Sequence, residues 1–250
     1  MLKVVHPAVP VACWSCSVAH NESTLFCPHC SKIQPPPGAD FFSVFGLAPR
    51  LNLDLSSLEM EFHRLSRRLH PDRFARAAAN EREWSLADTA LLNDAYRTLK
   101  DPITRTEYLL KLHGAEIGEE FAAANGRNGR DGKMGASRVP ADLLEEVFDL
   151  NMQLEEMRMA HKMGEDEDPA LKQELTAARK KFEGLREAVD HDLKVQWAVW
   201  DNGDEPARHG AQAAMIALLD RRRYLSNLVR DVSDTLEGKD SGGVFTQRGR

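Results

Sequence analysis

Several features of specialised proteins are missing from this chain of 250 residues. No apolar run approaches the roughly 20 residues that a membrane-spanning helix needs. The formal net charge of −6 excludes a general basic surface for nucleic acid, so any basic patch must be local. No glycine-rich phosphate loop occurs, and no nucleophile lies in a recognisable base-bearing motif. A hydrolytic or redox enzyme therefore finds no support in the sequence.

The N-terminus also lacks a targeting pattern. It has Lys3 but no long apolar segment, and it has no Arg- and Ser-rich start of the mitochondrial type. We therefore expect a cytoplasmic protein, and a mitochondrial one only if a transit peptide precedes this sequence. With 42% hydrophobic and 29% charged residues, the chain has ample material for one large or two to three small domains.

Cysteine is absent after residue 30. The four cysteines form two Cys-x-x-Cys pairs separated by ten residues: Cys13, Cys16, Cys27 and Cys30. Two such pairs can supply four thiolates to one tetrahedral ion, which would order a segment too short to fold alone. Zinc is the predicted ion, although an iron–sulfur cluster uses the same ligands; disulfides are disfavoured without a secretion signal. His20 and His29 are alternative ligands, but four cysteines already complete the shell.

An amphipathic, basic run ends at the tripeptide His70-Pro71-Asp72. Because the residue before a proline is disfavoured in the helical region, the helix should end near Leu69 and present the tripeptide at an exposed corner. Either Asp54 or Ser56 could cap this helix, with Ser56 and Glu59 fitting a capping box. The alternative interpretation, which assigns the tripeptide no function, is an ordinary helix end followed by a turn.

Helical patterns flank this corner on both sides. Upstream, one apolar face is formed by Leu58, Phe62, Leu65 and Leu69. Downstream, a second helical pattern contains Leu86, Ala90, Asn93, Tyr96 or Arg97, and Leu99 or Lys100. Two antiparallel helices joined at the corner are the simplest arrangement. Shorter helices are predicted at residues 40–47, where Asp40 can act as the cap, and at residues 103–112 after the pair Asp101-Pro102.

Two segments without periodicity separate these helices from their neighbours. Residues 34–38, Gln-Pro-Pro-Pro-Gly, form a stiff connector, and the glycine-rich residues 118–135 form a flexible linker. Beyond the linker, three amphipathic helices between residues 140 and 236 are joined by turns near residues 164–169 and 201–204. They predict an antiparallel three-helix bundle, and the fold class is all-α.

The helical hairpin resembles a J-domain. The whole order of elements resembles the HscB-type J-protein co-chaperones of iron–sulfur cluster assembly. The matching motifs are Phe-Ser-Val-Phe-Gly-Leu at 42–47, His-Pro-Asp-Arg-Phe at 70–74, Asn-Asp-Ala-Tyr-Arg-Thr-Leu at 93–99 and Glu-Tyr-Leu-Leu-Lys-Leu-His-Gly at 107–114. The last motif separates this branch from generic J-domains. The cysteine pairs followed by Gln34-Pro35-Pro36 resemble the zinc-bearing members.

The resemblance implies five regions. They are a tetracysteine zinc module with its proline-rich connector (1–38), a J-domain (39–115), a flexible linker (116–138), a three-helix bundle for scaffold binding (139–240) and a tail (241–250).

The resemblance also implies a partner for the J-domain. Family members dock on a 70-kDa heat-shock chaperone of the HscA or DnaK class, and the tripeptide triggers ATP hydrolysis by that partner. Here these roles fall on His70, Pro71 and Asp72, with four arginines as an electrostatic guide: Arg64, Arg67, Arg68 and Arg73. The chain would not itself be an enzyme, because the chemistry takes place on another protein.

The family's bundle binds the scaffold protein on which iron–sulfur clusters are built (IscU class). The implied patch is Leu144, Glu145 and Phe148 on the first bundle helix, with Tyr224 on the last. Leu144 and Phe148 are four residues apart and share a helix face, although either could instead be core. Glu145 stands where an apolar residue is common in the family.

Two other functions are weighed against this one. A general protein-folding J-protein would recruit many unfolded clients, and no Gly/Phe-rich client region is visible. A zinc-ribbon nucleic-acid binder would need a basic stripe, and only Lys3 and Lys32 lie near the cysteines. We expect neither a nucleic acid nor a membrane as a partner.

Overall fold

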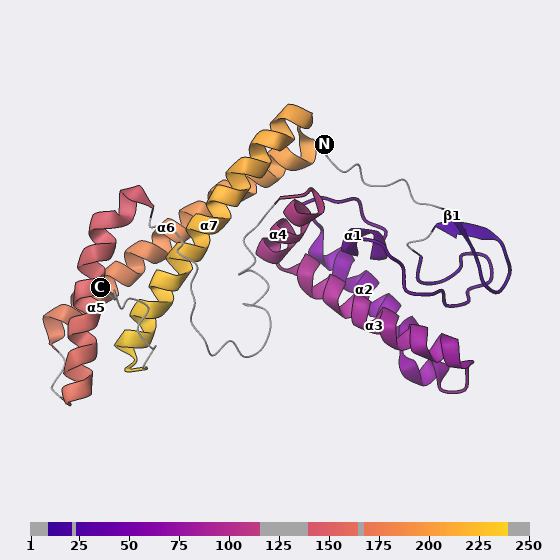
Figure 1. Ribbon diagram of the computed structural model, residues 1–250, viewed down its shortest axis with the longest axis horizontal. Coiled ribbons are helices and arrows are strands. Elements are labelled where there is room, and N and C mark those ends of the chain that lie inside the picture. The colour runs from indigo at the N-terminus through magenta and orange to yellow at the C-terminus, as the bar shows by residue number, and fades with distance from the viewer. Residues whose placement is uncertain (1–9, 22–23, 116–139, 165–167, 240–250) are drawn as a thin grey trace, which may run out of the picture. The chain divides into compact units, whose positions relative to one another are not determined.

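The computed structural model describes residues 10–21, 24–115, 140–164 and 168–239. The chain forms two compact units, residues 1–117 and 118–250 (Figure 1). The predicted linker at 116–138 and tail at 241–250 lie outside the described residues. Within the described ranges, no helix is both long and apolar enough to cross a membrane.

The first unit begins with two short strands, β1 (Pro10–Ala12) and β2 (Ala19–Asn21), which pair antiparallel with Val11 opposite His20. A further bridge joins Phe26 to Ile33. These strands were not predicted, because three residues are too few to show an alternating pattern. The prediction of a mainly helical protein is otherwise confirmed.

Helices make up the rest of both units. The first unit contains α1 (Phe41–Val44), α2 (Leu55–Leu69), the 3₁₀ helix η1 (Pro71–Phe74), α3 (Ala79–Lys100) and α4 (Pro102–Leu112). The second contains the 3₁₀ helix η3 (Ala141–Leu143), α5 (Leu144–Met163), α6 (Pro169–Asn202) and α7 (Glu205–Leu236).

Five of these helices begin at an aspartate whose carboxylate accepts backbone N–H groups of the first turn: Asp40, Asp54, Asp101, Asp168 and Asp204. An aspartate cap of this kind contributes about 1 kcal/mol. At α2 the cap is Asp54, whose Oδ1 accepts from the Ser56 N–H at 3.0 Å, and not the alternative Ser56.

The core of the first unit lies between α2 and α3. Leu58, Leu65 and Leu69 of α2 are buried, as predicted. The predicted second helix is present as α3, but its predicted pattern includes exposed positions: Leu86 is 61% exposed, and Asn93 is exposed too. The buried residues of α3 include polar side chains that hide the pattern: Glu81, Ser85, Asp88, Leu92, Ala95 and Leu99.

In the second unit, α6 and α7 form a long antiparallel hairpin, and α5 packs along the part away from its turn (Figure 1). Buried residues of α6 follow the predicted stripe, including Leu175, Phe182 and Leu193. Arg222 interrupts the apolar pattern of α7 because it pairs with Asp190 of α6, Nε to Oδ1 at 2.5 Å.

Candidate functional site

The His-Pro-Asp corner (His70, Pro71 and Asp72) lies directly after the last residue of α2, where the sequence predicted it. Leu69 is buried, while His70 leaves the helical region at φ −52° and ψ 127°. Pro71 then begins η1, and the Asp72 N–H donates to His70 Nδ1 at 3.3 Å. The side chain of Asp72 is 91% exposed. The corner therefore has a defined backbone and presents a carboxylate to solvent.

One hydroxyl group of α3 holds the start of this corner. Ser85 Oγ donates to the Leu69 carbonyl at 2.6 Å, whereas Thr89 Oγ1, 3.4 Å from the same oxygen, donates its single proton to the Ser85 carbonyl at 2.7 Å. Carbonyls in the last turn of a helix have no partner within it, so the Ser85 bond satisfies a buried acceptor and fixes the end of α2 against α3. Ser85 was not predicted, since a serine on a helix usually faces solvent.

The four arginines named for partner docking differ in their surroundings. Arg67 and Arg73 are exposed, and Arg64 is exposed but paired with Glu61. Arg68 is only half exposed, because its guanidinium carbon lies 3.9 Å from the centre of the Phe26 ring. Burial lowers the pKa of Arg68, and the charges of Arg64 and Arg73 add to this effect.

The four cysteines converge on one point. Their sulfur atoms all lie within 4.8 Å of one another, with Cys13 and Cys30 at 3.6 Å and Cys16 and Cys27 at 3.8 Å. A tetrahedral ion with bonds of about 2.3 Å holds its sulfur ligands about 3.8 Å apart. The donor set and its spacing therefore fit a closed tetrahedral metal site.

Both cysteine pairs have the same backbone turn. The residue after each second cysteine has a positive φ, 59° at Ser17 and 60° at Ser31. In each pair this residue's N–H donates to the carbonyl of the first cysteine, Cys13 or Cys27, at 2.9 Å. The equivalence of the two turns indicates that they are built to face one shared ligand.

The thiols of this cluster have opposed acidities. Burial raises the pKa of Cys13, but the N–H groups of Cys16 and Ser15 and the neighbouring thiols outweigh it and lower the pKa to about 6. The Val18 N–H lowers the pKa of Cys16, but burial and three neighbouring sulfurs raise it to about 12. Four thiolates this close need a cation to offset their repulsion.

Neither histidine of the segment belongs to the sulfur cluster. His20 is buried and bonds to Gln34 Oε1 through Nε2 at 3.0 Å and to Thr24 Oγ1 through Nδ1 at 2.9 Å. His29 is exposed. Gln34, which the sequence analysis placed in the connector, is 2% exposed, and its amide nitrogen lies 3.5 Å from Cys13 Sγ. We name the described residues 10–21 and 24–34 the tetracysteine module.

The patch named on the first bundle helix lies on the surface of α5. Leu144 is 56% and Phe148 is 66% exposed, and Glu145 is exposed beside them. Leu144 therefore does not belong to the buried stripe, which consists of Leu143, Val147, Leu150, Leu154 and Met157. Tyr224 of α7 is buried at 8% exposure, so the structure does not bring it to the surface with the others.

Known proteins are similar to this chain in sequence and in fold. No protein-family model matches the chain. The iron–sulfur cluster co-chaperone protein HscB of Mus musculus is 40% identical, and that of Homo sapiens 39%, over 111 residues, or 43% of this chain. The co-chaperone protein HscB homologue of Vibrio cholerae is 46% identical over 81 residues, or 32% of this chain. In each case the match spans about half of the relative, 47%.

Solved structures match over more of the chain. The human HscB crystal structure gives a TM-score of 0.57 at 26% identity and covers 89% of this chain and 97% of that one. The Vibrio cholerae HscB structure gives 0.52 at 25% identity, covering 79% of this chain and 98% of that one. The chain is therefore similar to HscB co-chaperones in sequence over part of its length and in fold over most of it.

The motif that separates the HscB branch from generic J-domains has a structural explanation here. Tyr108 of α4 stacks on Phe41, with ring centres 4.5 Å apart, and its hydroxyl accepts the Phe41 N–H at 2.8 Å. Burial raises the pKa of Tyr108. The tyrosine therefore fixes the start of α1 against α4.

Proposed function

We propose that this protein is a co-chaperone that stimulates ATP hydrolysis by a 70-kDa heat-shock chaperone of the HscA or DnaK class. It delivers an iron–sulfur scaffold protein of the IscU class to that chaperone. The observation that carries the proposal is the exposed His-Pro-Asp corner, held at the end of α2 by Ser85. Nothing in the corner needs to act as an acid or base, because the hydrolysed bond belongs to the partner.

The first test changes the corner alone. His70→Gln should reduce stimulation of the partner's ATPase to the unstimulated rate, because the side chain that orders the corner through the Asp72 N–H is altered. Steady-state ATP turnover with and without the protein gives the measurement. His63→Gln is the matched control, since His63 is an exposed histidine on α2, the helix that ends at the corner. Stimulation by the His70→Gln variant equal to that of His63→Gln would refute the proposal.

The proposed scaffold-binding surface is the exposed patch of Leu144, Glu145 and Phe148. Two large apolar side chains four residues apart on one helix face are a typical anchor for a partner, with a polar residue beside them. The buried Tyr224 of α7 would contribute only indirectly, by packing beneath the surface.

The second test removes the two anchors of this patch. The double change Leu144→Ala and Phe148→Ala should weaken scaffold binding by about 2–4 kcal/mol, or 30-fold or more, while the bundle keeps its stability. Calorimetric titration with the scaffold protein measures the loss. Val195→Ala on α6, which is 48% exposed, is the control for a general loss of surface apolar area. Unchanged affinity in the double variant would exclude this face.

We propose zinc as the metal of the tetracysteine module. Four thiolates leave no open position, which is typical of structural rather than catalytic zinc sites. Metal analysis should find one zinc per chain, and an absorbance spectrum without charge-transfer bands would distinguish zinc from an iron–sulfur cluster. The compartment of the protein stays a prediction.

A further inference from the structure

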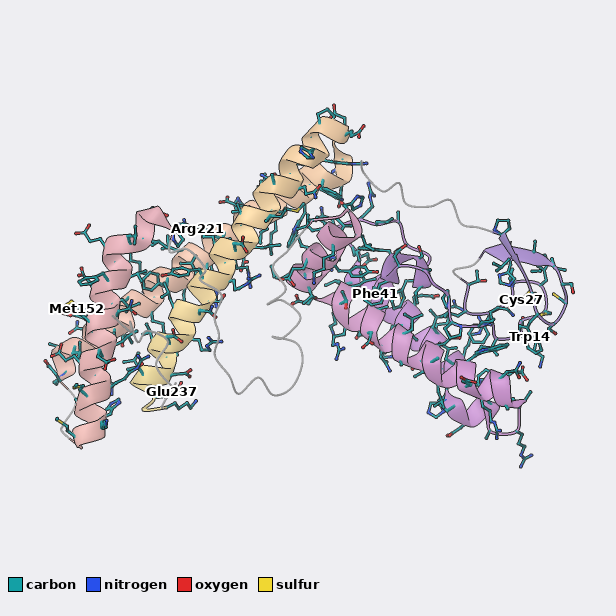
Figure 2. The ribbon with its side chains drawn as sticks, viewed as in Figure 1. Trp14, Cys27, Phe41, Met152, Arg221 and Glu237 are labelled. Atoms are coloured by element: carbon teal, nitrogen blue, oxygen red, sulfur yellow. The ribbon has the colours of Figure 1, made fainter. Side chains whose placement is uncertain are left out.

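The tetracysteine module contacts the J-domain on both sides of the His-Pro-Asp corner. On the α2 side, the Phe26 ring lies 3.9 Å from the Arg68 guanidinium carbon, two residues before His70. On the α3 side, the rings of Trp14 and Trp84 are 5.5 Å apart at 64°. Figure 2 shows Trp14 and Cys27 in the module, beside the helical hairpin.

A partly buried ion pair adds to the contact with α3. Lys32 Nζ lies 2.9 Å from Glu81 Oε1, and the Glu81 side chain is only 8% exposed. The hydrogen bond from Lys32 lowers the pKa of Glu81, although burial opposes it. Glu81 Oε2 also accepts the Ala78 N–H at 3.3 Å, at the start of α3. Without Lys32, a buried charge at this helix start would lose its partner.

Trp14, Phe26 and Lys32 lie within two residues of a proposed metal ligand in the chain. Trp14 follows Cys13, Phe26 precedes Cys27, and Lys32 lies two residues after Cys30. Their positions therefore depend on the conformation that the shared ion imposes on the two turns. These residues contact α2 and α3, the two helices that the corner connects.

We infer that Trp14, Phe26 and Lys32 are positioning residues for the His-Pro-Asp corner, through which the metal site controls how well the corner is held. This inference rests on the proposed co-chaperone function. It assigns Arg68 to the module contact and leaves Arg67 and Arg73 as exposed charges for a partner. It also gives the metal a role in chaperone stimulation without placing it at the partner's surface.

The experiment uses the full chain with three substitutions, Trp14→Ala, Phe26→Ala and Lys32→Ala. This triple variant keeps all four cysteines, and zinc analysis of the purified variant is the control that it still binds metal. Amide hydrogen exchange of residues 70–85 should become about tenfold faster, the size expected from losing an aromatic pair and a partly buried ion pair. Exchange in α4 should not change. Stimulation of the chaperone's ATPase should fall severalfold.

Two further arms make the result specific. Arg97→Ala removes an exposed ion pair within α3, with Asp94 at 2.8 Å, and should leave exchange at the corner unchanged. Chelation of the wild-type metal should reproduce the faster exchange, whereas chelation should add little to the triple variant, because the contacts are already lost.

The outcomes separate this inference from the proposed function. Exchange at residues 70–85 that stays at the wild-type rate in the triple variant would overturn the inference, and so would faster exchange with unchanged stimulation. If His70→Gln still stimulates the chaperone, the proposed co-chaperone function is wrong. The hydrogen-exchange data test the contact of the module with α2 and α3 independently of that result.

Discussion

Asp88, in the buried face of α3, is a carboxyl group in an apolar site. It is fully buried, and within the described residues neither of its oxygens has a hydrogen-bond partner. Burial raises its pKa from 3.8 to about 7. The folded protein therefore favours the protonated acid, and at neutral pH this residue opposes folding.

This residue predicts a pH dependence of stability. Between about pH 4 and pH 7 the folded state holds a proton on Asp88 that the unfolded state has released, so stability should fall as pH rises through this window and level off above it. Asp88→Asn should remove this slope and raise the free energy of unfolding at pH 8 by about 2 kcal/mol.

Urea unfolding at pH 5 and pH 8 measures the effect. Asp94→Asn, an exposed position on the same helix, is the control and should keep the wild-type slope. An Asp88→Asn variant with the slope of the control would show that the buried carboxyl is not its source.

Residues with local chemical signals were predictable from the sequence. The cysteine pairs and the proline after His70 act through ligand chemistry and backbone sterics, which depend on few neighbours. Ser85 gave no such signal, because its role depends on a carbonyl 16 residues earlier in the chain. The contact of Phe26 with Arg68 likewise joins residues far apart in sequence.

At the scale of helices and turns, the α6–α7 hairpin depends on a close approach at Gly203. Its N–H donates to the Val199 carbonyl at 2.7 Å, and a Cβ at this position would lie 2.5 Å from that oxygen and 2.9 Å from the Ala207 Cβ. The backbone conformation itself, with φ −79°, is open to any residue. Glycine is therefore required in this turn because there is no room for a Cβ atom, and not because of the backbone φ angle.

Gly203→Ala should destabilise the bundle by about 1–3 kcal/mol, because the turn must open to admit the methyl group. Gly184→Ala is a matched control within α6. Its Cβ would meet nothing within 4 Å, so it should stabilise the helix by roughly 0.5–1 kcal/mol. Urea denaturation of both variants tests the pair, and the same sign of change in both would contradict this account.

Helix ends were easier to predict than helix faces. Aspartate caps and prolines at first helical positions mark α1, α4 and the end of α2 directly. The buried face of α3 was not predicted, since the rule that apolar residues point inward fails where Glu81 pairs with Lys32 and Ser85 bonds to Leu69. In addition, Leu86 is exposed, although an apolar residue at this position suggests a buried one.

For the whole molecule, the two units have separate cores, and the sulfur cluster belongs to the first alone. We therefore predict that metal removal acts on one unit. Chelation should lower the first unit's unfolding temperature by about 10–20 °C, because loss of the ion costs the module several kcal/mol. Calorimetry with and without chelator should show an unchanged transition for the three-helix bundle. A shift of both transitions would contradict separate cores.

The chain's four tryptophans fall into two pairs, one in each unit. Trp14 and Trp84 meet across the contact of the module with α3, whereas Trp197 and Trp200 are buried on α6. The protein thus contains two intrinsic optical probes. Replacing one pair by phenylalanine leaves fluorescence from the other unit alone, so the arrival of a chaperone and the arrival of a scaffold can be followed separately without an attached dye.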